Sequence, residues 1–555
     1  MIDIDSWIAH DPDAVTRTEL IDLKQRADSG DSAARAELDD RFSGLLEFGT
    51  AGLRGEMAGG PFRMNRAVVR KAAAGLVDFL QERVGRDALL VIGYDARYNS
   101  HDFALDTAAV ATAAGARALI FPRHLPTPLL AWAVRFLGAD AGVMVTASHN
   151  PPRDNGYKVY LGGRAVEPEA RGVQIVPPFD SEIAARIAVT PPADEIPMAS
   201  TGWSLIDESV VDAYLERTKS LVAPAHASDL KIVHTSMHGV GGETMRRVLE
   251  GAGFTNVHEV PDQAEPDPDF PTVSFPNPEE PGALDLAIAE AKRVGADLVI
   301  ANDPDADRCS IAIPTSDGWR QLNGDEIGSI LGEQIAKIGA ITGGTFASSV
   351  VSSRLLKEIA HSHGLKHATT LTGFKWIARA PEIIFGYEEA IGFCVDPEGV
   401  KDKDGLTAGL LFAYVTAQLR SRGLTIEDQL DNLARAHGVY LTAPVTIRVS
   451  DLAIMPATMA HLRANSPQTL AGLSVTEVSD LSEGSPELPP TDAVVLLNEK
   501  GDRAVVRPSG TEPKVKCYLE VIEPVGESIE AAHAEAARRM AQLQKDMSAA
   551  LTLPA

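Results

Sequence analysis

Cysteine is scarce in this chain of 555 residues, which contains only three: Cys309, Cys394 and Cys517. They lie far apart in the sequence, with no C-x-x-C pair and no histidine-rich spacing around them. Such usage is typical of proteins from reducing compartments and lacks the ligand spacing of a structural zinc site. We therefore expect neither disulfides nor zinc.

Long hydrophobic runs are also missing, although 45% of the residues are hydrophobic. No stretch approaches the roughly 18 consecutive apolar residues that a membrane-spanning helix needs. The stretch 1–15 is acidic and shows neither the basic flank nor the apolar core of a secretory signal. We therefore expect a cytoplasmic protein without a membrane partner.

The chain has few positive charges relative to negative ones. It contains 51 Lys and Arg residues and 77 Asp and Glu residues, which give a formal net charge of −26 at pH 7. No basic stripe compensates for this charge locally, so we expect no nucleic-acid partner. An anionic small molecule would need a local cluster of Arg, Lys and backbone N–H groups.

What the sequence does contain is a repeated pattern. A chain of this length exceeds the size of one hydrophobic core and predicts three to four domains. Three segments combine a short apolar run, a turn of small residues and roughly a dozen helix-compatible residues that end near a glycine. They start near Ala88, Leu230 and Gly343, and each is followed by another apolar segment. This order predicts three βαβ units.

The C-terminal section has a different pattern. Strand-like stretches cover 440–449 and 493–497, and a helix is predicted over 529–551. This section is therefore predicted to be α+β. Loops or linkers are predicted at the proline- and aspartate-rich stretches 190–197, 261–281 and 482–491.

The sharpest local motif is Thr146-Ala-Ser-His-Asn-Pro-Pro, which follows the apolar run 141–145. Ser148 should therefore lie at the carboxy end of a strand, where α/β proteins bind ligands. The turn would place a nucleophilic or phosphoryl-carrying oxygen near His149 and Lys158. An ordinary Asn-Pro turn is the alternative. A serine hydrolase is disfavoured, because neighbouring Ser148 and His149 are expected to be poorly placed to bond each other and no G-x-S-x-G occurs.

A second motif, Asn302-Asp-Pro-Asp-Ala-Asp-Arg308, follows the apolar run 298–301. Its three carboxylates at alternate positions offer the hard oxygen ligands that Mg²⁺ prefers. An EF-hand would need Gly and Glu where this stretch has Arg308 and Pro314. A solvent-exposed acidic turn is the alternative.

Four further loops are ambiguous when taken alone. The stretch 507–516 could form a nest for a phosphate group, 385–392 has paired carboxylates for sugar hydroxyls, and 401–405 has lysines that could meet phosphate. The loop 49–55 carries one cation, Arg54. Plain turns are the alternative for all four, and for 49–55 the plain loop is favoured.

Taken in order, the Gly-Leu-Arg-Gly loop, Thr-Ala-Ser-His-Asn-Pro, Asp-Pro-Asp-Ala-Asp-Arg, Glu-Glu-Ala-Ile-Gly and Arg-Pro-Ser-Gly-Thr-Glu-Pro resemble the α-D-phosphohexomutase superfamily over roughly residues 45 to 520. The resemblance implies three related α/β domains with mixed sheets and a smaller C-terminal α+β domain around a central cleft. The domains are expected at 1–202 with the phosphoserine loop, 203–310 with the metal loop, 311–425 with the sugar-recognition loop and 426–555 with the phosphate-binding loop.

The resemblance also implies roles for individual residues. Ser148 would be phosphorylated in the active enzyme and would bind Mg²⁺ together with Asp303, Asp305 and Asp307. The other expected catalytic residues are His149, Lys158, Arg54 and Arg308. The expected substrate-binding residues are Gly373, Lys375, Glu388, Ala390, Lys403, Arg507, Ser509, Gly510 and Thr511.

The implied activity is the interconversion of a sugar 1-phosphate and a sugar 6-phosphate, of glucose or mannose, through a phosphoserine and a bisphosphate. A sugar bisphosphate such as glucose 1,6-bisphosphate would be the primer. Ala390 stands where many hexose-directed relatives carry serine, and Glu-Glu-Ala-Ile-Gly resembles phosphopentomutases, so (deoxy)ribose phosphates remain an alternative. The same residues could also belong to a phosphatase or to a sugar-phosphate sensor without catalysis.

Overall fold

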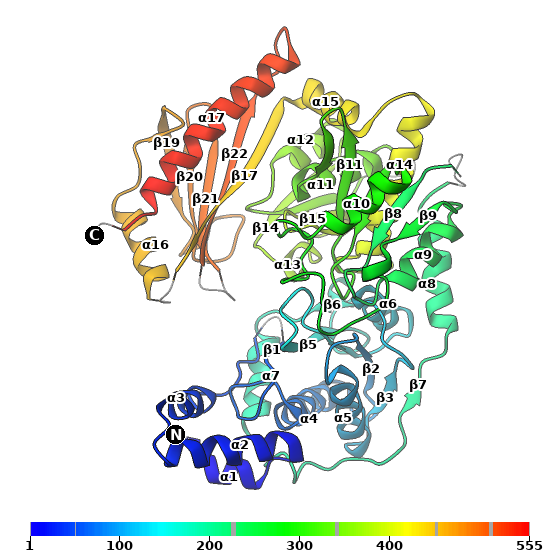
Figure 1. Cartoon of the computed structure of the whole chain (residues 1–555), viewed down its shortest axis with the longest axis vertical. Coiled ribbons are helices and arrows are strands. Elements are labelled where there is room, and N and C mark those ends of the chain that lie inside the picture. Colours follow the sequence, from blue (N-terminus) through cyan, green and yellow to red (C-terminus); the bar gives the residue numbers. More distant parts are fainter. Residues whose placement is uncertain are drawn as a thin grey trace. The chain divides into compact units, whose positions relative to one another are not determined.

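The computed structural model describes residues 2–49, 52–223, 229–338, 343–449, 453–509 and 514–553. The chain forms two compact units, which we call unit 1 (Met1–Leu322 and Gly392–Ala417) and unit 2 (Asn323–Ile391 and Gln418–Ala555). Within the described ranges, no helix has both the length and the apolar character needed to cross a membrane. The described residues form four sheets, and Figure 1 labels most of their strands.

The first sheet lies in unit 1 and has the strand order β1-β5-β4-β2-β3-β7, with β6 beside β5. Its strands are β1 (Leu53–Glu56), β2 (Leu89–Tyr94), β3 (Arg117–Ile120), β4 (Ala141–Val145), β5 (Asp154–Leu161), β6 (Val173–Gln174) and β7 (Ser204–Leu205). The helices of this segment are α1 (Ile4–Ala9), α2 (Ala14–Asp28), α3 (Ser32–Arg41), α4 (Arg66–Val84), α5 (Ser100–Ala113), α6 (Thr127–Phe136), α7 (Phe179–Ala188) and α8 (Ser209–Lys219). Every residue of β4 is buried, as expected for a parallel strand covered on both faces.

The second sheet, also in unit 1, has the order β12-β11-β10-β8-β9. Its elements are β8 (Ile232–Thr235), α9 (Gly242–Gly251), β9 (Val257–Glu259), α10 (Asp285–Val294), β10 (Leu298–Ala301), β11 (Ser310–Thr315) and β12 (Gly318–Gln321). Two later elements, β16 (Gly392–Cys394) and most of α14 (Gly405–Ser421), return to this unit. Helix α10 packs against β8 and β10, and its buried Ala287 and Ala291 join the core between them.

Three strands of the third sheet lie in unit 2, where β13 has β14 on one side and β15 on the other. Its elements are α11 (Gly324–Ala336), β13 (Thr345–Ser349), α12 (Leu355–Ser362), β14 (Lys366–Thr370), α13 (Phe374–Ile377) and β15 (Ile383–Glu388). Helix α11 begins with a capping box, in which the Asn323 side chain accepts from the Glu326 N–H and the Glu326 carboxylate accepts from the Asn323 N–H.

The three sheets share one arrangement of strands. In each, a first strand pairs in parallel with the next strand of the chain on one side and with the third on the other: β2 with β3 and β4, β8 with β9 and β10, β13 with β14 and β15. A helix joins the first strand to the second in every case. The three predicted βαβ units are thereby confirmed.

The loop after the third strand also has the same backbone feature in all three repeats. A residue other than glycine adopts a left-handed conformation there: Ser148 with φ 52°, Ala306 with φ 53° and Ile391 with φ 52°. Such residues are uncommon and persist where the surrounding structure holds them, often at functional sites. These are the loops that contain the serine, aspartate and glutamate motifs.

The fourth sheet is antiparallel, with the order β17-β22-β21-β20-β19-β18, and lies in unit 2. Its elements are α15 (Ile426–His437), β17 (Val439–Arg448), α16 (Ile454–Ala464), β18 (Thr469–Leu470), β19 (Leu473–Asp480), β20 (Val494–Asn498), β21 (Arg503–Pro508), β22 (Lys514–Glu523) and α17 (Ile529–Ala550). The predicted strands and the predicted C-terminal helix are confirmed. The fold class predicted for the domains, three of α/β type and one of α+β type, is confirmed as well, whereas the four domain boundaries remain predictions.

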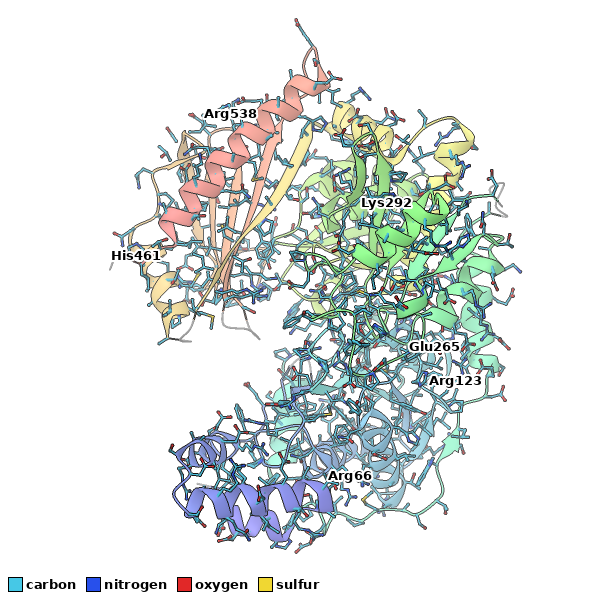
Figure 2. All side chains as sticks on the ribbon, in the orientation of Figure 1. Arg66, Arg123, Glu265, Lys292, His461 and Arg538 are labelled. Atoms are coloured by element: carbon cyan, nitrogen blue, oxygen red, sulfur yellow. The ribbon has the colours of Figure 1, made fainter. Side chains whose placement is uncertain are left out.

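Helix α17 is fixed to this sheet by one buried cation. Arg538 lies on the outward face of the helix (Figure 2), whereas the neighbouring Arg539 is only 1% exposed. The Arg539 guanidinium donates to both Asp502 carboxylate oxygens, at 3.0 and 3.1 Å, and to Glu523 at 2.7 Å. A buried charge needs such partners, because an unpaired one would be strongly destabilising.

Candidate active site

Ser148 lies in the loop that follows β4, and it is 3% exposed. Its N–H donates to the Thr146 hydroxyl at 2.9 Å, and its own Oγ donates to Asp303 Oδ2 at 2.7 Å. These two bonds satisfy the buried polar groups of a residue in a sparsely populated backbone conformation. The serine oxygen therefore points toward the aspartates of the second repeat, 155 positions away in the sequence.

His149 contacts the same oxygen, since its Nδ1 lies 3.1 Å from Ser148 Oγ. The expectation that these neighbours are poorly placed to bond each other is wrong. The left-handed φ of Ser148 turns the chain sharply, which allows two consecutive side chains to converge. Burial lowers the pKa of His149 well below its ordinary value, and the charges of Arg308 and Arg54 add to this effect. Both effects favour the neutral imidazole.

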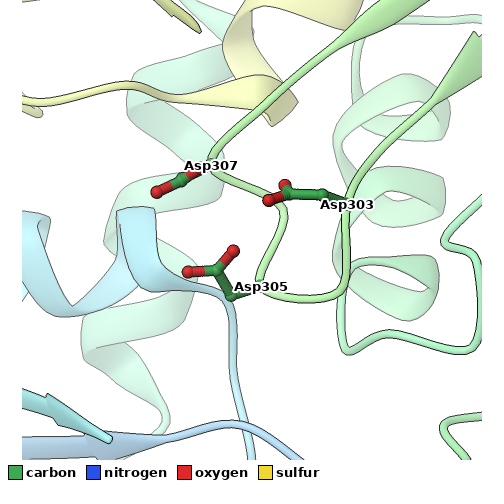
Figure 3. A group of neighbouring side chains, drawn as sticks. All are labelled: Asp303, Asp305 and Asp307. Carbon is green, nitrogen blue, oxygen red and sulfur yellow. The ribbon is translucent and has the colours of Figure 1, made fainter. Parts of the chain in front are cut away.

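The three aspartates of the second repeat form one buried group at the loop after β10 (Figure 3). Asp303, Asp305 and Asp307 each offer a carboxylate oxygen, and these oxygens lie within 4.8 Å of one another. Burial raises the pKa of Asp303 well above its ordinary value, and the other two carboxylates raise it further. The alternative of a solvent-exposed acidic turn is wrong, because the three side chains are at most 1% exposed.

The donor set of this group fits a hard divalent cation. In the part of the chain that the structure describes, Asp305 Oδ1 and Asp307 Oδ1 are buried without a hydrogen-bond partner. Buried polar oxygens are almost always satisfied, so unpartnered ones call for an explanation such as an ion. Carboxylate oxygens are the ligands of Mg²⁺ and Ca²⁺. The aspartate group could therefore hold a metal ion.

Two lysines balance the charge of the aspartates. Lys158 Nζ, on β5, lies 2.7 Å from Asp305 Oδ2 and 2.9 Å from Asp307 Oδ2, and Lys403 Nζ lies 3.2 Å from Asp307 Oδ2. Burial by itself would lower the pKa of Lys158, but Asp305 and Asp307 raise it above its ordinary value. Burial would likewise raise the pKa of Asp307, but Lys158, Lys403 and Arg308 hold it well below its ordinary range.

The loop that carries Lys403 is held by two tyrosines of unit 1. The Tyr160 hydroxyl donates to Asp402 at 2.7 Å, and the Tyr214 hydroxyl donates to Asp404 at 2.9 Å. Asp404 also accepts from the N–H groups of 406 and 407 at the start of α14. These bonds explain why Lys403, which the sequence groups with the substrate-binding residues, lies against the aspartates.

The two predicted catalytic arginines lie in the same region. Arg54, on β1, donates to the Asn150 side chain at 3.0 Å, and burial lowers its pKa. The Arg308 N–H donates to Asp303 Oδ1 at 3.0 Å, and its guanidinium lies 3.4 Å from Glu279. The structure thus brings together every predicted catalytic and metal-binding residue within unit 1.

Arg97 was missed by the sequence analysis. It follows β2, its side chain is 1% exposed, and it lies 3.5 Å from Asp95. Its guanidinium donates to four main-chain carbonyls of the serine loop: those of Ser148 and Asn150 at 2.6 Å, Pro151 at 2.7 Å and Asp154 at 3.2 Å. The Asp95-Ala96-Arg97 sequence directly after a buried strand could have indicated a functional arginine. The neighbouring sequence does not indicate which loop that arginine contacts.

Thr127 was also missed. Its hydroxyl, at the start of α6, donates to Asp305 Oδ2 at 2.6 Å. The same residue's N–H donates to the Asp305 carbonyl at 2.9 Å. The threonine therefore holds the central aspartate of the group by both its main chain and its side chain.

The remaining predicted residues lie in unit 2. Gly373 precedes α13 with φ 102°, Lys375 lies within that helix, and Glu388 ends β15 with Ala390 two positions later. Arg507 is paired with Lys516 between β21 and β22, and the Ser509 N–H donates to the Lys514 carbonyl at 2.9 Å. Gly510 and Thr511 lie outside the described residues.

Comparison with known proteins gives matches along most of the chain. Four family models match in order: phosphoglucomutase/phosphomannomutase alpha/beta/alpha domain I over 45–190, domain II over 212–318, domain III over 323–436 and the C-terminal domain over 445–541. Each of the five sequence motifs lies inside one of these ranges.

The matches to two named relatives and to one solved structure span most of this chain and nearly all of each matched protein. The chain is 45% identical to a "probable phosphomannomutase" of Haemophilus influenzae, over 82% of this chain and 93% of the relative. It is 36% identical to a "probable phosphoribomutase" of Schizosaccharomyces pombe, over 93% of this chain and 92% of the relative. The solved structure of a Paramecium phosphoglucomutase, parafusin, shares the fold with a TM-score of 0.70 at 19% identity, over 91% of this chain and 96% of that one. The chain therefore belongs to the phosphoglucomutase/phosphomannomutase family, within the α-D-phosphohexomutase superfamily.

Proposed function

We propose that the enzyme is a phosphosugar mutase in which Ser148 carries the phosphoryl group between the two oxygens of one sugar. The observation that carries this proposal is the 2.7 Å contact of Ser148 Oγ with Asp303, inside a buried group of three aspartates and two lysines. A family member of this kind is a phosphotransferring isomerase that acts on sugar phosphates.

The aspartate group supports Mg²⁺ as the metal, held by Asp303, Asp305 and Asp307 together with a phosphoryl oxygen on Ser148. When bound, the ion would neutralise negative charge that develops on the transferring phosphoryl group. The residues of the chain add to this effect. Lys158 and Arg308 supply fixed positive charge in a site from which water is largely excluded, where such charge is most effective.

We assign proton transfer to His149 and Lys158 because of where their side chains lie. His149 Nδ1 lies 3.1 Å from Ser148 Oγ, so it can exchange a proton with that oxygen. Lys158 Nζ lies against two of the aspartates, from which the protonated amine can give a proton to a reacting sugar oxygen. Arg54 orients the serine loop through Asn150.

Two transfers complete the reaction. Phosphoserine 148 gives its phosphoryl group to the free hydroxyl of a sugar monophosphate, and the hydroxyl proton passes to a basic group of the site. The resulting bisphosphate then returns its other phosphoryl group to Ser148 Oγ. A bisphosphate such as glucose 1,6-bisphosphate would prime the enzyme. We assign the non-reacting phosphate to Arg507, Ser509, Gly510 and Thr511, and the sugar hydroxyls to Glu388, with Gly373 and Lys375 beside it.

We propose glucose or mannose phosphates as substrates, in accord with the 45% identical relative named phosphomannomutase. Pentose phosphates are a second candidate because of Ala390, which cannot donate the hydrogen bond that a serine would offer to a hexose. The relative named phosphoribomutase supports this candidate. A cytoplasmic location stays a prediction from the sequence.

The sugar can be decided by comparing kcat/KM for α-glucose 1-phosphate, α-mannose 1-phosphate and ribose 1-phosphate with Mg²⁺ and primer. A hexose is expected to win, and Ala390→Ser should raise the hexose-to-pentose ratio about fivefold, because one hydrogen bond contributes about 1 kcal/mol. A pentose that won by more than about tenfold would transfer the assignment to phosphopentomutase. Release of inorganic phosphate instead of a second sugar phosphate would identify a phosphatase.

Arg97→Lys is expected to lower kcat about 10- to 100-fold, because a lysine keeps the charge but cannot reach four carbonyls, and a misplaced nucleophile reacts slowly. Initial rates at saturating substrate would measure this loss. Arg153→Lys is the matched control, since Arg153 lies on the serine loop itself with 85% of its side chain exposed. Equal rates for both variants, with intact folding, would contradict the positioning role of Arg97.

A further inference from the structure

Glu389, the second of two adjacent glutamates in the sugar loop, is bound by residues at and just after the carboxy end of β13. The Glu389 carboxylate accepts from Ser349 Oγ and from Ser352 Oγ, each at 3.1 Å. Its N–H donates back to Ser352 Oγ at 3.2 Å. The two hydroxyls are themselves 2.9 Å apart. Glu389 is thus held at both its main chain and its side chain by a serine pair, Ser349 and Ser352.

The serine pair is held in turn by the fourth sheet. Arg503, the first residue of β21, donates to the Ser352 carbonyl at 2.6 Å and to the Val350 carbonyl at 3.0 Å. Glu520, 1% exposed on β22, accepts from Ser353 Oγ and from the Arg354 N–H, each at 2.8 Å. All of these groups belong to unit 2.

The start of helix α11 also packs against the sugar loop. Its first residue is Gly324, and a Cβ there would lie 2.0 Å from the Glu389 carbonyl oxygen. Its second residue, Asp325, accepts from the Ser353 N–H at 2.7 Å and from the Tyr387 hydroxyl at 2.9 Å. The main chain of the sugar loop is therefore enclosed from two directions, and little space remains for it to shift.

The first repeat uses the equivalent loop in the same way. There the loop after β2 supplies Arg97, which holds the serine loop after β4. In the third repeat the loop after β13 supplies Ser349 and Ser352, which hold the loop after β15. In both, the loop after the first strand fixes the loop that carries the proposed chemistry.

We propose that Glu389 is a positioning residue for the sugar, which acts by fixing the sugar loop to the fourth sheet through the serine pair and Arg503. The contact with the sugar hydroxyls stays assigned to Glu388, as in the proposed function. Strand β21 begins at Arg503 and contains Arg507, so one strand both holds the serine pair and carries a residue assigned to the non-reacting phosphate. This inference rests on the proposed role of Glu388 in sugar binding.

The test uses the full-length enzyme with Mg²⁺ and glucose 1,6-bisphosphate, and it compares kcat/KM for glucose 1-phosphate and ribose 1-phosphate. Glu389→Ala is expected to lower kcat/KM about 30-fold, or about 2 kcal/mol of transition-state stabilisation, because the sugar loop would lose its fixed position. The ratio between the two sugars should also change, which a general loss of stability would not cause. Glu389→Gln should recover most of the rate, because its amide oxygen can accept from both serines. Glu382→Ala, an exposed glutamate just before β15, is the matched control.

A double-mutant cycle separates positioning from direct contact with the sugar. Ser349→Ala with Ser352→Ala should reproduce the effect of Glu389→Ala, and the triple variant should be no worse, because coupled residues are not additive. A triple variant with multiplied losses, or a Glu389→Gln variant as slow as Glu389→Ala, would overturn the inference. Glu388→Ala tests the proposed function separately: normal turnover there removes the sugar role of the loop, whatever Glu389 does.

Discussion

Ser148→Ala is expected to lower the turnover of glucose 1-phosphate about 10⁴-fold or more, the loss seen when a nucleophile that acts as one unit with its neighbours is removed. Without Oγ the site loses its phosphoryl carrier, the oxygen that contacts Asp303 at 2.7 Å. The change removes a single oxygen from a side chain that is 3% exposed, so the fold should be retained.

Rates measured with Mg²⁺ and primer, together with phosphate on the intact protein determined by mass spectrometry, would check this result. Ser329→Ala is the matched control, because Ser329 is a buried serine of α11 whose Oγ has no partner among the described residues. It should keep normal turnover and normal phosphorylation. Appreciable mutase activity in Ser148→Ala, or phosphate still attached to that variant, would show that the phosphoserine mechanism is wrong.

Asp303→Asn is expected to have opposite effects on activity and on stability. Turnover should fall about 10³-fold or more, because the oxygen proposed to react would lose a charged partner and the proposed metal site would lose a ligand. The metal-free protein should become more stable by about 1 to 3 kcal/mol, because one of three buried like charges is removed. An asparagine oxygen can still accept the Ser148 hydrogen bond.

Thermal unfolding in a chelator would measure the stability, and initial rates with excess Mg²⁺ would measure the activity. Asp317→Asn, in the exposed turn between β11 and β12, is the control that should change neither. A metal-free Asp303→Asn protein less stable than the parent would mean that the three carboxylates do not repel one another. In that case Lys158 and Lys403 would already neutralise the negative charge of the three aspartates without a metal ion.

The local sequence was sufficient to predict the position of a site residue where that position depends only on nearby residues in the chain. An apolar strand followed by a polar motif predicted where Ser148 and the three aspartates lie, each in the loop at the carboxy end of its own strand, where α/β proteins bind ligands. The three βαβ units were visible as a repeat. Local sequence failed for His149, whose contact with Ser148 depends on a left-handed φ that no residue type announces.

The loops proposed to carry chemistry could be predicted from the amino-acid sequence alone, since side-chain type and strand ends are local properties. Which side chains meet depends instead on tertiary packing. Arg97 holds the serine loop across 51 positions, and Lys403 reaches Asp307 because two tyrosines fix its loop. Contacts of this kind depend on how the elements pack, and a buried charge is stable only beside partners that packing brings from distant parts of the chain.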